Sequence, residues 1–247
     1  MEIQDYLVAG LQTGFIDYNF ASLEQYHPKL VINDYKRGTK VLSSVINELR
    51  QCEEFYFSVA FITNSGVACI ISVLEELAEK GVVKGKIIAS QYQNFTEPEA
   101  LRRLMQFPNI ELRIVTEGNF HAKGYIFRRK DRYSFIIGSS NLTQAALSEN
   151  KEWNVKLTSL EEGLVMQSIM QEFQHTFEQA TPVTERYIDS YRKLYERLAD
   201  ARQRSRQVEQ SMLRTSDTLY LTYSGTSGQS FRKHPDMKPG LSGHLAG

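Results

Sequence analysis

The pattern of apolar and polar positions divides most of the chain into short strands and amphipathic helices. Runs rich in aromatic and β-branched residues predict strands at 55–62, 86–90, 110–115, 119–127, 132–139 and 152–157. Apolar residues spaced three and four apart predict helices at 38–50, 65–80, 98–106, 141–147, 161–178 and from 183 to about 206. Because early strands alternate with helices and a hairpin follows, we expect an α/β fold with a mixed, mainly parallel β-sheet flanked by helices on both faces.

Changes in composition divide the chain into four segments. Residues 1–30 form a lead-in with a short helical pattern, and residues 31–180 form the main domain. Residues 181–210 are expected to form a helix that packs on this domain or extends from it. Residues 211–247 are rich in Ser, Thr and Gly, a composition typical of a linker or a poorly ordered tail.

Composition and charge limit the functions that fit. Lys plus Arg and Asp plus Glu number 29 each, so no overall field attracts nucleic acid or a membrane, and any basic surface must be local. The N-terminus lacks the basic start and apolar run of a signal peptide. No apolar stretch approaches the roughly 20 residues of a membrane helix. We therefore expect a cytoplasmic protein with no membrane partner, in which Cys52 and Cys69 are reduced.

A cluster of polar residues interrupts the two apolar runs in the middle of the chain. His121 and Lys123 are two residues apart, so their side chains share one face of a predicted strand. Ser139 and Asn141 repeat this spacing where the next strand ends, and Glu152 follows. Each residue alone has an ordinary structural explanation, but together they cost free energy unless they serve one another or a ligand. Ammonium and amide groups suit phosphate oxygens, and a carboxylate can orient an imidazole, so the cluster predicts a phosphate-handling site.

These residues resemble the phospholipase D superfamily, whose motif is H-x-K, four residues, D, and then G-S-x-N. His-Ala-Lys at 121–123 and Gly-Ser-Ser-Asn at 138–141 match it, whereas Arg128 stands at the aspartate position. Some nuclease members also lack that aspartate and use a glutamate eleven residues after the asparagine. Glu152 stands at that offset. The resemblance is therefore to the branch that includes metal-independent restriction endonucleases.

A narrower resemblance covers roughly residues 20–200. Segments such as those at 30–63, 84–104 and 119–127 are similar to the N-terminal phospholipase D-like nuclease domain of bacterial DEAD/DEAH-box helicases, also called type III restriction Res-subunit proteins. The sequence has no Walker A motif, so the helicase motor is not in this chain. The resemblance implies a phospholipase D-like fold for the main domain and, as a possible partner, a helicase domain of the same full-length protein.

The resemblance also implies a mechanism. His121 would attack a phosphodiester and form a phosphohistidine, with Lys123 and Asn141 holding the phosphate oxygens. Ser139 would add a hydroxyl contact, and Glu152 would hold His121 in its reactive tautomer. This chemistry needs no metal and no cofactor. Because the chain carries one such motif and the reaction needs a second histidine, the resemblance implies a homodimer with one shared active site.

The substrate implied by the resemblance is nucleic acid, DNA in preference to RNA. The predicted hairpin tip bears Arg128, Arg129, Lys130 and Arg132, which we expect to contact backbone phosphates. One alternative is a non-catalytic DNA-binding or targeting module with a degenerate site, which the missing aspartate favours. A lipid phosphodiesterase ranks third, because the sequence shows no interfacial amphipathic helix.

Overall fold

The computed structural model describes residues 2–81, 83–198, 204 and 208. The chain divides into two compact units, residues 1–196 and 197–247. The tail expected at 211–247 lies outside the described residues. The last expected helix, 183 to about 206, is described as far as residue 198 and at residue 204. The boundaries expected from composition within the first unit stay predictions.

In the described part of the chain, eight strands form one sheet in the order β1-β7-β6-β5-β2-β3-β4-β8. The strands are β1 (Lys29–Val31), β2 (Glu54–Val59), β3 (Lys84–Ser90), β4 (Ile110–Val115), β5 (Lys123–Arg128), β6 (Tyr133–Gly138), β7 (Asn154–Ser159) and β8 (Thr181–Pro182). The sheet is mixed, as predicted, but the expectation of a mainly parallel sheet is wrong. Only β2–β3 and β3–β4 pair in parallel, and the other five pairings are antiparallel. Short links such as that between β5 and β6 leave no room for the crossover that parallel pairing requires.

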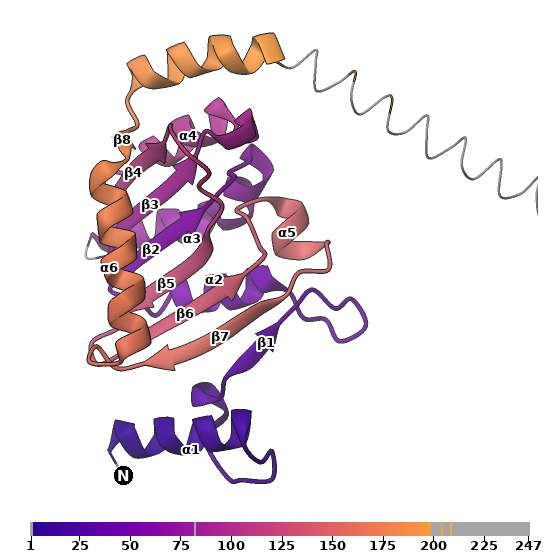
Figure 1. Cartoon of the computed structure of the whole chain (residues 1–247), viewed down its shortest axis with the longest axis vertical. Coiled ribbons are helices and arrows are strands. Elements are labelled where there is room, and N and C mark those ends of the chain that lie inside the picture. Colours follow the sequence, from indigo (N-terminus) through magenta and orange to yellow (C-terminus); the bar gives the residue numbers. More distant parts are fainter. Residues whose placement is uncertain (1, 82, 199–203, 205–207, 209–247) are drawn as a thin grey trace, which may run out of the picture. The chain divides into compact units, whose positions relative to one another are not determined.

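Helices cover both faces of the sheet, which confirms the expected arrangement. Figure 1 shows α6 along one face and α2, α3 and α4 on the other. The helices are α1 (Ile3–Phe15), α2 (Val41–Leu49), α3 (Asn64–Lys80), α4 (Pro98–Met105), α5 (Gln144–Ser148) and α6 (Leu164–Gln179), with 3-10 turns η1 (Glu24–Tyr26) and η2 (Tyr92–Asn94). Residues 185–198 are also helical. No helix of the described chain is long and apolar enough to span a membrane.

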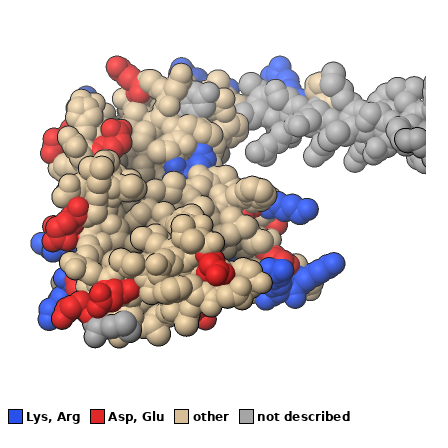
Figure 2. Space-filling model, turned by 60° about the horizontal axis from the view of Figure 1, so that its bottom comes forward, with Lys and Arg blue, Asp and Glu red and all other residues tan. Residues whose placement is uncertain are grey.

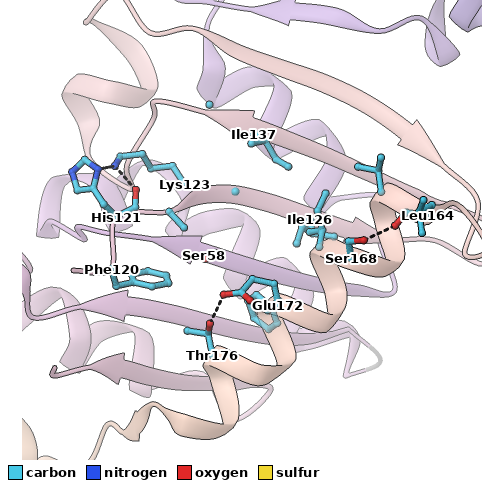
Figure 3. A pocket seen from close by; sticks show the side chains of 16 residues that line it. Ser58, Phe120, His121, Lys123, Ile126, Ile137, Leu164, Ser168, Glu172 and Thr176 are labelled. Carbon is cyan, nitrogen blue, oxygen red and sulfur yellow. Dashed lines mark hydrogen bonds between the residues drawn. The ribbon is translucent and has the colours of Figure 1, made fainter. Parts of the chain in front are cut away.

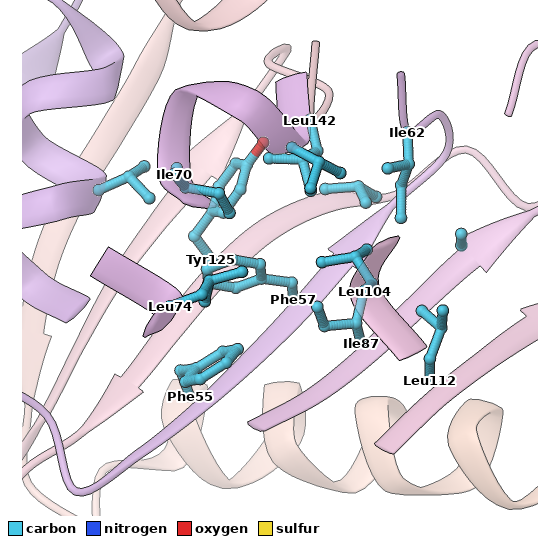
Figure 4. Packing of buried hydrophobic residues seen from close by; sticks show 14 of the residues in the cluster. Phe55, Phe57, Ile62, Ile70, Leu74, Ile87, Leu104, Leu112, Tyr125 and Leu142 are labelled. Carbon is cyan, nitrogen blue, oxygen red and sulfur yellow. The ribbon is translucent and has the colours of Figure 1, made fainter. Parts of the chain in front are cut away.

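The alternation of side chains along β2 explains the two-sided core. Phe55 and Phe57 point to the α3 face and are fully buried, where they pack in one cluster with residues such as Leu74 (Figure 4). Tyr56, between them, points to the opposite face and contacts Phe173 of α6 with ring centroids 5.4 Å apart. Burial of each such side chain contributes roughly 1.5–3 kcal/mol, so both helical layers are held to the sheet mainly by apolar contacts.

The central strands are shorter than the sequence pattern predicts. β5 begins at Lys123 and β7 begins at Asn154, so His121 and Glu152 each precede a strand rather than lying within it. The reason is pairing: the ladder between β2 and β5 ends where Val59 meets Lys123, and residues before Lys123 have no ladder partner in β2. The polar cluster therefore lies at one end of the neighbouring strands β5, β6 and β7, just outside the ladder.

Candidate active site

His121 and Lys123 contact each other directly. The Lys123 Nζ atom lies 2.7 Å from His121 Nδ1 and 2.7 Å from the His121 carbonyl oxygen (Figure 3). An ammonium group can only donate, so Nδ1 accepts, and the hydrogen of a neutral ring lies on Nε2. Partial burial lowers the pKa of Lys123 from its usual value, and the carboxylate of Glu152 offsets part of this effect. The pair expected from the sequence is therefore present, and Glu152 lies close enough to influence it.

Ser139 and Glu152 form the second contact of the cluster. The Ser139 hydroxyl donates to Glu152 Oε2. The backbone fixes both residues, because Trp153 N–H donates to Ser139 Oγ at 3.1 Å and Ser139 N–H donates to the Trp153 carbonyl at 3.1 Å. The structure thus pairs Glu152 with Ser139, and the orienting role toward His121 that the resemblance implied stays a prediction.

Asn141 is held by a residue that sequence reasoning missed. Its Oδ1 atom accepts from the Phe61 backbone N–H at 3.1 Å, so the NH₂ group is the end of the amide that can donate to a phosphate oxygen. The Phe61 ring also meets the His121 ring edge-on, with centroids 5.7 Å apart. Phe61 follows the aromatic run of β2, which is the only local signal that could have drawn attention to it.

A buried amide shapes the turn that carries Ser139 and Asn141. Asn154 is 1% exposed and its Oδ1 atom accepts from Ser140 N–H at 3.2 Å, while its Nδ2 atom donates to Ser140 Oγ at 2.9 Å. Gly138 comes so close to β7 that an added Cβ would lie 2.1 Å from the Trp153 carbonyl oxygen. Asn154 is one of several polar residues in the segment 152–157, so no local signal in the sequence sets it apart.

An apolar cavity of about 670 Å³ adjoins this cluster. His121 and Lys123 lie at one end and α6 forms one wall (Figure 3). The apolar lining comes from the sheet and from α6, and includes Ile126, Ile137, Leu164, Ile169 and Phe173. Leu164 is 78% exposed. The sequence predicted α6 as an amphipathic helix but gave no sign that its first turn borders a cavity.

The basic hairpin tip lies at the other end of β5 from His121. Three of its four cations pair with carboxylates: Arg128 with Glu54 at 3.2 Å, Arg129 with Glu48 at 2.6 Å, and Arg132 with Asp131 at 2.7 Å. Lys130 is exposed. DNA phosphates would compete with these carboxylates, so contact with DNA at the tip stays a prediction. On the face shown in Figure 2, the centre is mostly uncharged and most acidic and basic side chains lie around the rim.

The cluster gathers the groups that phosphoryl transfer needs: an imidazole, an ammonium, an amide, a hydroxyl and a carboxylate. The ammonium and amide can donate to an oxyanion, and the imidazole can act as nucleophile or proton carrier. Within the described residues, no group of three or more His, Cys, Asp or Glu side chains is placed to hold a metal ion.

Comparison with known proteins agrees with the fold. NucT from Helicobacter pylori is 20% identical, with a TM-score of 0.51 over 63% of this chain and 98% of that chain. Nuc from Salmonella typhimurium, a phospholipase D family member, is 20% identical, with a TM-score of 0.50 over 64% and 100%. Phosphatidylserine synthase from Haemophilus influenzae is 14% identical, with a TM-score of 0.51 over 71% and 45%. At these identities the likeness shows the fold alone.

Sequence comparison identifies the family. No curated protein sequence gives a significant match. The family model described as "Cardiolipin synthase, PLD-like domain" matches residues 45–181, which is more than half of the 247 residues and includes every residue of the polar cluster. The chain therefore belongs to the family of phospholipase D-like (PLD-like) domains.

Proposed function

We propose that the protein is a phosphodiesterase that cleaves DNA without a metal, through a phosphohistidine at His121. The observation that carries this proposal is the contact of Lys123 with His121 at 2.7 Å, beside the hydrogen bond between Ser139 and Glu152. Family membership supports phosphodiester chemistry, and the sequence resemblance to aspartate-less nucleases supports DNA as the substrate.

In the first step, His121 attacks phosphorus, a P–N bond forms, and the P–O bond to the leaving group breaks. Lys123 and Asn141 stabilise the charge on the non-bridging oxygens. For Nε2 to attack, the ring proton must lie on Nδ1. The hydrogen bond from Lys123 to Nδ1 must therefore break first. Phosphate oxygens are the stronger partner for its ammonium. Glu152 is the acceptor that the resemblance assigns to Nδ1–H.

In the second step, water attacks phosphorus and the P–N bond breaks, which leaves a phosphate monoester and restores His121. A second histidine protonates the leaving oxygen in the first step and accepts a proton from water in the second. We propose that His121 of a second copy fills this role in a homodimer, because one motif supplies one histidine. We also propose that the domain is the nuclease module of a helicase or restriction system, which rests on the resemblance over residues 20–200.

The test is DNA cleavage in the presence of EDTA. The wild type should cleave, and His121→Ala should lose at least about 10³-fold in rate because the nucleophile is gone. His175→Ala is the matched control, since His175 is an exposed histidine on α6. Absence of cleavage of any DNA or RNA by the wild type, with DNA binding retained, would overturn the proposal in favour of the non-catalytic binding module.

The apolar cavity favours a second candidate substrate, a phosphodiester with an apolar substituent such as a phospholipid. His121 and Lys123 line one end of the cavity, and most of its lining surface is apolar. The same two variants assayed on phospholipid vesicles would decide between the substrates. Faster turnover of the lipid than of DNA, lost in His121→Ala, would support the lipid.

A further inference from the structure

A second, polar cavity lies at the opposite end of β6 from the candidate active site. It encloses about 600 Å³ between α2, η1 and the strands β6 and β7. Ser134 lines this cavity near the start of β6, whereas Ser139 follows the end of that strand. Five residues of extended chain separate the two serines, which corresponds to roughly 17 Å. The two sites are therefore distinct.

Two buried donors in the cavity wall are without a hydrogen-bond partner among the described residues. They are the Ser134 hydroxyl and the Arg129 Nε–H group. Ser134 is 3% exposed, so water does not reach it freely from the surface. A buried donor left unpaired costs about 1–3 kcal/mol. Buried donors in proteins usually have a hydrogen-bond partner. A ligand in the cavity would supply a partner to both of these donors.

The charge of the lining indicates the sign of that ligand. Four cations line the cavity against two carboxylates: Lys29, Arg129, Arg132 and Lys156 against Glu24 and Glu48. Glu48 is shared, because one carboxylate oxygen accepts from Arg129 at 2.6 Å and the other from Lys156. Asp131, outside the lining, holds one nitrogen of Arg132 at 2.7 Å. Counted with Asp131, these side chains carry one more positive than negative charge.

The sheet places these groups on one face. Ser134 of β6 pairs with Thr158 of β7, and Lys156 lies two residues before Thr158, so all three side chains point toward α2. Arg132 stacks its guanidinium over the Tyr26 ring, 5.6 Å from the centroid. Donors therefore converge on the cavity from the strands, while the Tyr26 ring is in contact with Arg132 and stacks on Tyr6 with centroids 5.7 Å apart.

We propose that this cavity binds a phosphate monoester. A small side-chain shift would bring the Ser134 hydroxyl and Arg129 Nε–H, both now buried, within reach of the phosphate oxygens, with Lys156 and Arg132 supplying charge. A monoester carries a charge of about −1.5 to −2 at pH 7 and presents three strong acceptor oxygens, enough for both unpaired donors and one cation, whereas a diester presents two non-bridging oxygens. The cavity exceeds the size of a free phosphate ion, so an organic phosphate is expected. The proposal does not depend on the proposed nuclease activity.

The experiment is calorimetric titration with a 5′-mononucleotide in a Lys123→Ala background, which removes the main cation of the candidate active site. Ser134→Ala should weaken binding by about tenfold, because it removes one donor to a charged oxygen. Ser134→Ala should leave the unfolding temperature unchanged or raised, because the hydroxyl has no partner to lose. Ser43→Ala, an exposed serine of α2, is the matched control and should bind like the parent.

Further arms define what is recognised. Arg129→Lys keeps a positive charge beside Glu48 but removes Nε–H, so it should weaken binding as Ser134→Ala does. The nucleoside without phosphate should not bind, and inorganic phosphate should bind less tightly than the nucleotide. Unchanged binding in Ser134→Ala, or equal binding of nucleoside and nucleotide, would overturn the phosphate site. Equal affinity for inorganic phosphate would overturn the assignment to an organic phosphate.

Discussion

The carboxylate of Glu152 has two candidate partners, and the difference decides what it does in catalysis. In the structure it accepts from the Ser139 hydroxyl. When a substrate phosphate binds Lys123, the Glu152 carboxylate could also accept a hydrogen bond from His121 Nδ1–H. In that case a substitution of Glu152 removes the group that favours the reactive tautomer. If it acts only through Ser139, its loss should be no worse than loss of that hydroxyl.

We expect Glu152→Gln to lower the single-turnover rate on a chromogenic phosphodiester by about 10³–10⁴-fold, as for the orienting residue of a triad. Ser139→Ala should cost only about tenfold. Glu149→Gln, an exposed carboxylate nearby, is the control. Equal and non-additive losses in Glu152→Gln, Ser139→Ala and the double variant would show that Glu152 acts through Ser139 alone.

At the scale of elements, the close approach of β6 and β7 keeps Ser139 beside Glu152. Gly138 permits this approach, since an added Cβ would lie 2.1 Å from the Trp153 carbonyl oxygen and 2.5 Å from Asn154 Cα. Both are backbone atoms, so relief requires the strands to move apart. Gly124 on β5 offers a matched position, where the nearest atom to an added Cβ is a side-chain carbon of Ile137 at 3.8 Å.

Gly138→Ala should therefore destabilise the protein by about 1–3 kcal/mol, because overpacking forces the backbone to shift. It should also slow phosphodiester cleavage, since the Ser139–Glu152 contact spans these strands. Gly124→Ala should change the free energy of unfolding by less than about 0.5 kcal/mol. Denaturant unfolding curves of the two variants measure the difference, and equal midpoints would contradict the strand-spacing argument.

Local patterns fixed the elements but not their partners. The apolar stripe of α3 and the aromatic run of β2 are long enough to be recognised, whereas β1 and β8 have three and two residues and carry no period. The antiparallel pairing of β2 with β5 depends on residues about 70 positions apart, which no local pattern encodes. The motif residues can be recognised from their spacing in the sequence. Phe61 and Asn154 cannot, because they contact Asn141 and Ser140 from other segments of the chain.

At the scale of the whole molecule, Glu48 joins three distant segments. It lies on α2, with its side chain 4% exposed, and binds Arg129 of the hairpin and Lys156 of β7. Burial alone would raise its pKa, but the hydrogen bonds and charges of Lys156 and Arg129 outweigh burial and lower it. A carboxyl whose pKa is lowered on folding stabilises the protein above its unfolded pKa, and this contribution is lost as pH falls through the folded pKa.

Glu48→Gln should lower the free energy of unfolding by about 3 kcal/mol at neutral pH, since it leaves two partly buried cations without their carboxylate. The difference from wild type should begin to shrink as pH falls below about 4.5, where Glu48 of the unfolded chain becomes protonated, and it should disappear as pH falls through the lowered pKa of the folded carboxyl. Glu76→Gln breaks an exposed ion pair with Arg50 and should have little effect at any pH. A wild-type to Glu48→Gln difference that does not vary with pH would contradict this account.

The proposed shared site predicts how activity responds when active and inactive copies are mixed. If each site needs His121 from both copies, only pairs of wild-type chains are active, and after subunit exchange activity falls as the square of the wild-type fraction. An equal mixture with His121→Ala should then retain about one quarter of the wild-type activity, whereas independent sites would retain about one half. Mixing with His175→Ala should leave activity unchanged. A linear decline with His121→Ala would show that each chain works alone, and the second proton carrier would then have to come from the same chain.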